Sequence, residues 1–128
     1  MRALSSFEYA VLRIVPRVER EEFINTGVIV FCLERKFLRA RVHVDEERLR
    51  ALYPDLEIEH IRDHLEGFRK VAEGAVDGGP VAALSIRQRF HWLVAPRSTV
   101  IQVSPVHAGM CEDREEVLDA LFRKLVLC

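Results

Sequence analysis

The sequence predicts an α+β fold in which a mainly antiparallel four-stranded sheet packs against two or three helices. Three observations predict this class. Short runs of β-branched and aromatic residues, typical of strands, fill the first third of the chain and recur near residue 100. Two longer segments, in the middle and at the C-terminal end, carry apolar residues at helical spacing. The length of 128 residues is that of one domain, which we expect to span residues 1–128.

The first predicted strand covers residues 7–15 and ends at Pro16. Apolar residues occupy both of its alternating sets of positions, which predicts an inner strand covered on both faces. Arg13 is the exception, because an arginine on a mostly apolar strand needs a carboxylate or an anion nearby. Glu22, in the charged connection that follows, is the candidate carboxylate.

Residues 26–33 form the most strongly apolar strand, and residues 37–44 form the next, so the two together predict a hairpin with a turn at 34–36. Gly27, near the start of the apolar strand, predicts a bulge or a close approach of two backbones. The alternation along residues 37–44 predicts two opposite sets of side chains. One faces the core (Leu38, Ala40, Val42, Val44) and the other faces out (Arg39, Arg41, His43).

Two helices are predicted next. Asp45 caps a short helix that ends at Pro54, and Asp55 caps a longer amphipathic helix. The buried stripe of the longer helix is expected to contain Ile58, Ile61, Leu65, Phe68 and Ala72. Residues 77–80, Asp-Gly-Gly-Pro, are expected to end it. Residues 81–90 are ambiguous and favour a short helix.

The C-terminal third is expected to hold a fourth strand at residues 98–103, a turn-rich segment at 104–110 and a last helix. Asp113 and Glu116 form the start signal of that helix. One helical face carries Val117, Leu118, Leu121, Phe122 and Leu125. Leu127 lies outside this face at an apolar end, which predicts a homodimer. The alternative is that the terminus folds back onto its own domain.

Composition excludes several classes of protein. The formal net charge of −1 gives no global electrostatic support for a nucleic-acid partner, and no window reaches the roughly 20 apolar residues of a membrane helix. The N-terminal apolar run is too short for a signal peptide. The 3 cysteines, Cys32, Cys111 and Cys128, have no C-x-x-C spacing, so neither a disulfide framework nor a zinc motif is indicated. We therefore expect a reduced, cytoplasmic protein without metal or cofactor.

The first candidate site is an anion site at Arg97, Ser98 and Thr99. The arginine offers a planar fork for phosphate or carboxylate, and the hydroxyls add donors. The alternative is an ordinary turn that enters a strand, with Ser98 bonded to local backbone. In the ligand-binding hypothesis, Arg13 and His107 join Arg97 and Ser98 around the anion.

Two further candidates involve carboxylates and a thiol. His107 and Cys111 have the chemistry of a nucleophile pair or of metal ligands, but the alternative is a histidine that bonds backbone in a turn. Glu21, Glu22 and Asn25 have the chemistry of a base or a Mg²⁺ site, against a solvated charge cluster in which Asn25 sets a turn.

For one row of basic side chains and for the single tryptophan, the structural interpretation is preferred over a functional one. Arg39, Arg41 and His43 form a basic row that could grip a nucleic-acid backbone, but no exposed aromatic residues alternate with them. A solvated strand face that discourages edge pairing is the preferred interpretation. Trp92 is expected in the core, with its N–H bonded to one acceptor.

Three segments together resemble a bacterial family, domain of unknown function 3037: YAVLRIVP (9–16), EEFINTGVIVFC (21–32) and RFHWLVAPRSTVIQVSPVHAGMC (89–111). The resemblance covers most of the chain. Thr26 departs from it mildly, because valine is expected there. The resemblance implies a small stand-alone bacterial protein, with no activity or catalytic residues to carry over. It also implies a gene neighbourhood with HipA-like kinases, and therefore a protein partner.

Two functions are thus expected as alternatives. The first is a binding module that works through a protein partner, with a HipA-like kinase as the candidate. The second is an enzyme or a binder of a phosphate- or carboxylate-bearing small molecule, which uses Arg13, Arg97, Ser98 and His107. These side chains must then converge on one cleft.

Overall fold

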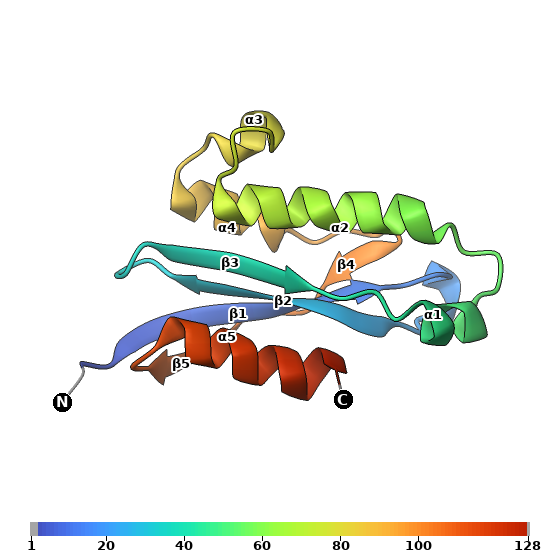
Figure 1. The fold of residues 1–128 in the computed structure, drawn as a ribbon, viewed down its shortest axis with the longest axis horizontal. Helices are drawn as coiled ribbons and strands as arrows, with labels where there is room; N and C mark the ends of the chain where they lie inside the picture. Colours follow the sequence, from blue (N-terminus) through green and yellow to red (C-terminus); the bar gives the residue numbers. More distant parts are fainter. Residues whose placement is uncertain (1–2, 128) are drawn as a thin grey trace.

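The computed structural model describes residues 3–127 and has a sheet with helices on both faces (Figure 1). The sheet has the order β3-β2-β1-β4, and a fifth strand, β5, also pairs with β1. Its strands are β1 (Ser5–Ile14), β2 (Ile24–Cys32), β3 (Phe37–Val42), β4 (Ile101–Val103) and β5 (His107–Cys111). The helices are η1 (Val18–Arg20), α1 (Glu46–Leu52), α2 (Ile58–Glu73), α3 (Gly79–Ala82), α4 (Ile86–Leu93), α5 (Arg114–Phe122) and the π-helical turn η2 (Arg123–Leu127). The predicted α+β class is confirmed.

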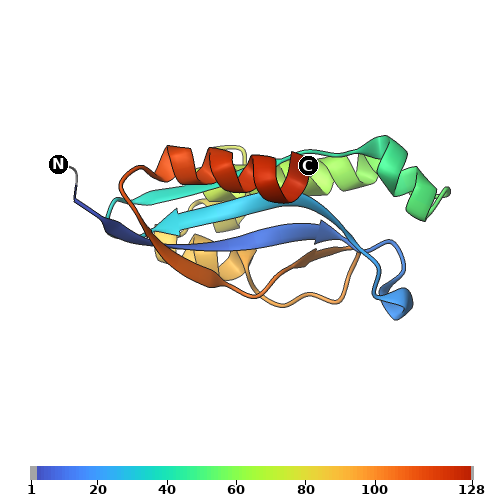
Figure 2. The same ribbon diagram turned by 90° about the horizontal axis from the view of Figure 1, so that it is seen from below.

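Strand β1 is the inner strand that the sequence predicts. It pairs antiparallel with β2 on one side, and with β4 and β5 end to end on the other. Its alternating side chains enter two separate cores. Leu12 and Ile14 pack with residues of α2 and α4, whereas Phe7 packs with residues of α5. The sheet therefore lies between two helical layers, and the view from below shows α5 in front of it (Figure 2).

The predicted hairpin is formed by β2 and β3, and Gly27 lies where the sequence places a bulge or close approach. The register with β1 shifts between Leu12 and Arg13, opposite this part of β2. A Cβ atom at Gly27 would lie 2.8 Å from the carbonyl oxygen of Arg41 on β3. Only glycine fits at this distance without a shift of one strand. Next to it, buried Thr26 donates from Oγ1 to the His43 carbonyl oxygen at 2.6 Å.

The two faces of β3 are not simply a core face and a solvent face. Leu38 and Ala40 are buried beneath α2, as predicted. On the other face, Arg41 is paired with Asp119 of α5, and its guanidinium lies 5.8 Å from the centre of the Phe122 ring. The expectation that Arg41 faces solvent holds only in part: 38% of its side chain is exposed, and α5 forms a second layer over the rest of this face.

The two helices predicted after the hairpin are present as α1 and α2, but α2 begins and ends at residues other than those predicted. Asp45 caps α1, accepting a hydrogen bond from the Arg48 backbone N–H at 3.1 Å. Helix α2 has Glu57 at its N-cap instead of Asp55, and it ends at Gly74, not in residues 77–80. Gly74 has a φ of 65° and so supplies the left-handed residue that ends a helix. All members of the predicted stripe are buried (Ile58, Ile61, Leu65, Phe68, Ala72).

The ambiguous segment, residues 81–90, contains the end of α3 and the first part of α4, which continues to Leu93. Ser85 starts α4 with a capping box, in which Ser85 and Gln88 exchange hydrogen bonds with each other's backbone. Phe90 and Leu93 are the buried residues of α4. Trp92 lies between them in the chain but on another side of the helix, and it is 37% exposed. The prediction that Trp92 is a core residue is therefore wrong.

The last strand was not predicted. Residues 104–110 were expected to be turns, but residues 107–111 form β5, and β4 starts at Ile101 instead of residue 98. Pro105 separates the two strands because it has no N–H to donate. β5 forms because it pairs with β1, although Ala108 and Gly109 favour strands poorly. Gly109 also leaves room for the Phe7 ring, which lies 2.8 Å from where its Cβ would be.

The last helix starts as predicted, since the Asp113 carboxylate accepts from the backbone N–H groups of Glu115 and Glu116. Leu118 and Val126 are its buried residues, and Val126 replaces the predicted Leu125. The π-helical turn η2 explains this shift, because a wider turn moves the next inward position by one residue. Leu127 is 51% exposed, so it does not fold back into its own core. The homodimer itself stays a prediction.

Cys32 and Cys111 are buried free thiols, and Cys128 lies outside the described residues. Among the helices described, none combines the length and the apolar character needed to cross a membrane.

Candidate functional site

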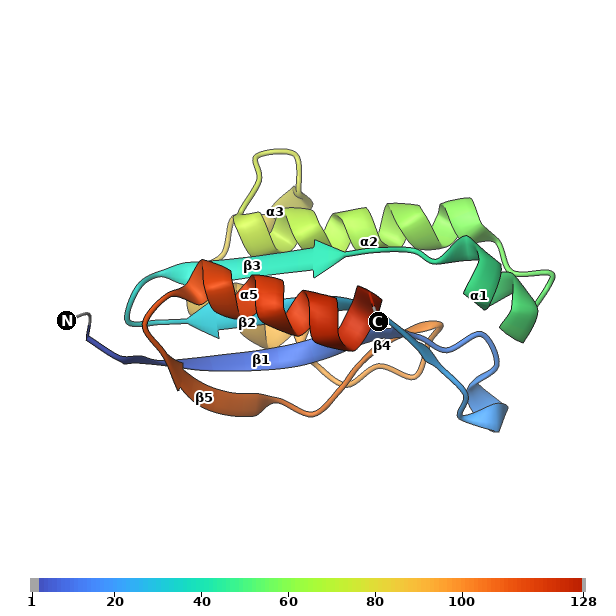
Figure 3. The same ribbon diagram turned by 60° about the horizontal axis from the view of Figure 1, so that its bottom comes forward.

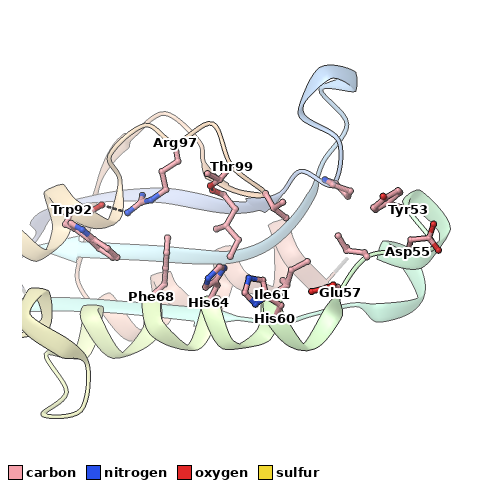
Figure 4. Close-up of a pocket in the computed structure, with 14 residues that line it drawn as sticks. Tyr53, Asp55, Glu57, His60, Ile61, His64, Phe68, Trp92, Arg97 and Thr99 are labelled. Carbon is pink, nitrogen blue, oxygen red and sulfur yellow. Dashed lines mark hydrogen bonds between the residues drawn. The ribbon is translucent and has the colours of Figure 1, made fainter.

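A cleft of about 500 Å³ opens between α2 and the segment that joins α4 to β4 (Figure 4). The N-terminal half of α2 and the α1–α2 loop form one wall, and residues 97–101 form the other. The lining is mainly apolar and aromatic. It consists of Pro16, Tyr53, Asp55, Leu56, Glu57, His60, Ile61, His64, Phe68, Trp92, Arg97, Thr99, Val100 and Ile101.

Helical spacing explains the α2 wall. Residues four positions apart lie on the same side of a helix, so His60 and His64 stand together with Phe68 one turn further on. The centres of the two imidazole rings are 4.4 Å apart. Both histidines are exposed and flank the buried stripe of α2, which contributes Ile61 to the cleft.

Arg97 lies at one end of the cleft and closes the C-terminal end of α4. Its Nη1 donates to the carbonyl oxygens of Leu93 (2.9 Å) and Ala95 (3.0 Å), and its Nη2 donates to that of Trp92 (2.7 Å). The guanidinium also lies 4.8 Å from the ring centres of both Phe68 and Trp92. Burial lowers the pKa of Arg97 from its ordinary value. These contacts identify Arg97 as the cap of α4.

The charges of the cleft are separated along its length. Figure 4 shows Trp92 and Arg97 at one end and Tyr53, Asp55 and Glu57 at the other. Asp55 and Glu57 are exposed and lie just before and at the N-cap of α2. The cleft is therefore cationic at one end and anionic at the other, and Ile61 lies between the two ends together with the imidazole rings of His60 and His64 (Figure 4).

The predicted anion site does not assemble. Arg97 lines the cleft, and Ser98 next to it is exposed outside the lining. Arg13 lies between Leu12 and Ile14, which face α2, so it points to the opposite face of the sheet. His107 is on β5, with its ring centre 5.2 Å from that of Tyr9. The four side chains thus do not surround a common point.

Two of the predicted residues have structural surroundings instead. The Arg13 guanidinium lies 4.2 Å from the centre of the Phe23 ring, and its buried Nε has no hydrogen-bond partner among the described residues. Glu22, the expected partner of Arg13, forms an ion pair with Arg20 instead. Asn25 donates from Nδ2 to the carbonyl oxygen of Leu125 at 3.1 Å, which ties β2 to η2.

His107 and Cys111 do not form a nucleophile pair. Both are on β5, four positions apart, which separates their Cα atoms by roughly 13 Å on an extended strand. Cys111 is buried, and burial raises the pKa of its thiol, with nearby Cys32 adding to the rise. Within residues 3–127, no group of three or more His, Cys, Asp or Glu side chains is placed to hold a metal ion.

The sequence prediction missed most of this cleft. His60 and His64 carried a signal in their four-residue spacing beside the stripe of α2. The contribution of Trp92 could not be predicted, because it depends on where α4 begins and how it packs on α2.

The comparisons with known proteins agree with the resemblance in sequence. A family model described as "Protein of unknown function (DUF3037)" matches residues 9–126. No curated protein and no solved structure matches the chain. Since the matched residues are nearly the whole chain, the protein belongs to the DUF3037 family.

Proposed function

We propose that this protein is a binding module that holds an apolar segment of a protein partner in the cleft between α2 and residues 97–101. The observation that carries the proposal is the composition of the cleft, where partly exposed Trp92 lies against Arg97 and Phe68. Tryptophan and arginine are the side chains that most often dominate the binding energy of protein interfaces. Val100, also 37% exposed, extends the apolar surface.

The charge distribution defines the segment further. Arg97 keeps its Nε–H and part of its Nη2 free of the hydrogen bonds that cap α4. An acidic residue of the partner therefore fits at the Arg97 end. A basic residue fits at the other end, beside Asp55 and Glu57. The complementary segment is apolar in the middle and carries opposite charges at its two ends.

Binding is favoured over catalysis by the state of the polar groups. The aliphatic hydroxyl of the cleft, Thr99 Oγ1, donates to the Ile101 carbonyl oxygen at 3.2 Å, so it is not poised as a nucleophile. The two thiols described are buried elsewhere, between the sheet and α5. The candidate partner is a HipA-like kinase, and the resemblance to the family is what supports that choice.

The test is a titration of a purified HipA-like kinase from the same host into this protein, followed by calorimetry. Trp92→Ala should weaken binding at least tenfold, because it removes the aromatic anchor of the cleft. Val76→Ala, at a fully exposed position outside the cleft, is the matched control and should leave the affinity unchanged. Equal affinity for wild-type protein and Trp92→Ala, or no binding of the kinase at all, would rule out this proposal.

A small anionic ligand is the second candidate. Its support is the size of the cleft, which lies within the range of small-molecule pockets, together with Arg97 and the two histidines on its walls. A thermal-shift panel of nucleotides and dicarboxylates separates the two functions. A shift that Arg97→Met abolishes favours the small ligand, and no shift with any compound favours the protein segment.

A further inference from the structure

The outer edge of β5 has free hydrogen-bonding groups. Val11 of β1 donates its N–H to Ser104 Oγ and accepts from the Ser104 N–H, both at 2.8 Å, so its backbone groups point toward this side. The backbone N–H and C=O groups of successive residues in a strand point alternately to its two sides, so those of Tyr9 and Phe7 also point toward β5. Their partners there are His107 and Gly109. The intervening residues Ala108 and Met110 therefore direct N–H and C=O outward.

Nothing in the described part of the chain covers these outward groups. β5 pairs only with β1 within residues 3–127, and Figure 3 shows it as the outermost strand of its edge. Apart from His107, the exposed side chains of β5 are apolar as well. Met110 is 60% exposed, and Leu4 and Val106, which flank the β1–β5 pair, are 58% and 40% exposed.

The edge also lacks the charges that usually prevent strands from joining. The opposite edge strand, β3, carries Arg39 and Arg41 and follows Lys36 in the turn. β5 has the sequence HAGMC, in which His107 is the one exposed ionisable residue. Two β3 edges brought together would set arginine against arginine, whereas two β5 edges bring alanine, glycine and methionine together.

We propose that this edge pairs with β5 of a second copy of the chain, which joins two sheets into one continuous antiparallel sheet. An antiparallel pair of identical strands has a two-fold axis, so each copy presents the same groups to the other and the contact closes as a dimer. The outward N–H and C=O groups of Ala108 and Met110 then form hydrogen bonds with the same groups of the second copy. Exposed Met110 and Val106 become covered in the same step.

This interface differs from the one that the sequence suggests. Leu127 is exposed on η2, at the end of the helix that covers the sheet face, whereas β5 is at the sheet edge. The β5 interface uses backbone hydrogen bonds as well as apolar contact, which makes it directional. None of the residues of β5 lines the cleft beside α2, so the proposed dimer contact and the cleft use different residues.

The first experiment measures molar mass by light scattering over a range of concentrations. The wild-type protein should approach the mass of two chains as concentration rises. Ala108→Lys and Met110→Lys should each remain at the mass of one chain, because the lysines of the two copies meet across the axis. The control Val76→Lys adds the same charge at a fully exposed position elsewhere and should dimerise like the wild type.

The second experiment needs no variant. Hydrogen exchange should slow at the amides of Ala108 and Met110 only at concentrations where the dimer forms. The Gly109 amide, which points toward β1, should be slow at every concentration. Three results would each overturn the proposal: a monomer at all concentrations, a dimer that survives both lysine variants, or unchanged exchange at Ala108 and Met110 in the dimer.

Discussion

Asn25 and Leu125 are 100 positions apart in the chain, and the side-chain amide of Asn25 donates a hydrogen bond of 3.1 Å to the main-chain oxygen of Leu125. The carbonyl groups in the last turn of a helix have no partners within the helix. Asn25 supplies one of those partners, and so it fastens the C-terminal helix to the start of β2.

Asn25→Ala should therefore lower the free energy of unfolding by about 1 kcal/mol, because it leaves the Leu125 carbonyl without this partner. Urea unfolding measures the change. Gln102→Ala is the control, since the Gln102 side chain also donates to a backbone oxygen, that of Thr99, but at an exposed position. We expect a change within about 0.5 kcal/mol there. Equal losses in the two variants would contradict the role assigned to Asn25.

Gly27→Ala should destabilise the protein by roughly 1–3 kcal/mol through overpacking. The added methyl group would meet the Arg41 carbonyl oxygen at 2.8 Å and a Leu12 methyl group at 3.1 Å, so β2 must move away from β3 or β1. Gly67→Ala is the matched control in α2, where the added methyl group meets nothing within 4 Å.

Gly67→Ala should stabilise the protein by up to about 1 kcal/mol, since alanine is the better helix former. Thermal unfolding of the two variants should thus shift the midpoint in opposite directions. A Gly27→Ala midpoint at or above that of the wild type would show that the strands tolerate the closer contact.

Arg97→Lys should cost about 1–2 kcal/mol of stability although it preserves the charge. A lysine ammonium cannot reach the Leu93, Ala95 and Trp92 carbonyl oxygens with the planar geometry of the guanidinium. Denaturant titration measures the loss. Arg62→Lys, in an exposed ion pair with Glu59, should change stability little. A similar small effect at both positions would mean that Arg97 is not a structural cap.

Stability should fall at alkaline pH because of Cys111. Burial raises the pKa of the Cys111 thiol in the folded state. In the unfolded state the thiol has the ordinary cysteine pKa of about 8.5, so there it loses its proton at a lower pH than in the folded state. The stabilisation is complete below the unfolded pKa and is lost as pH rises through the higher folded pKa. The free energy of unfolding, measured from about pH 7 to 10, should therefore decline above pH 8 or so.

Cys111→Ala should reduce this alkaline decline, whatever its effect on stability at neutral pH. The native thiol should also react slowly with a thiol reagent at pH 7, since it is buried and protonated. An equally steep decline in the alanine variant would assign the effect to other groups.

The cleft and the N-cap of α2 are features that local sequence patterns did not predict correctly, because they depend on residues that are distant in the chain. Asp55 satisfied the local rule for an N-cap, but the chain enters α2 two residues later, at Glu57, and Asp55 lines the cleft instead. Arg97 and Arg13 were both expected to bind one anion. The sheet separates them, and no local pattern reports which face of a sheet a residue of another strand will occupy.

The sequence by itself determined the α+β class, the inner position of β1, the hairpin with its close approach at Gly27, and the buried stripe of α2. These features follow from periodicity and from steric demands of single residues, which are local properties. Tertiary structure alone decided the existence of β5, the ion pair of Arg41 with Asp119 of α5 and the exposure of Trp92. In each case the conformation or exposure of a segment depends on a partner that lies far away in the chain, because pairing and packing free energies outweigh weak local preferences.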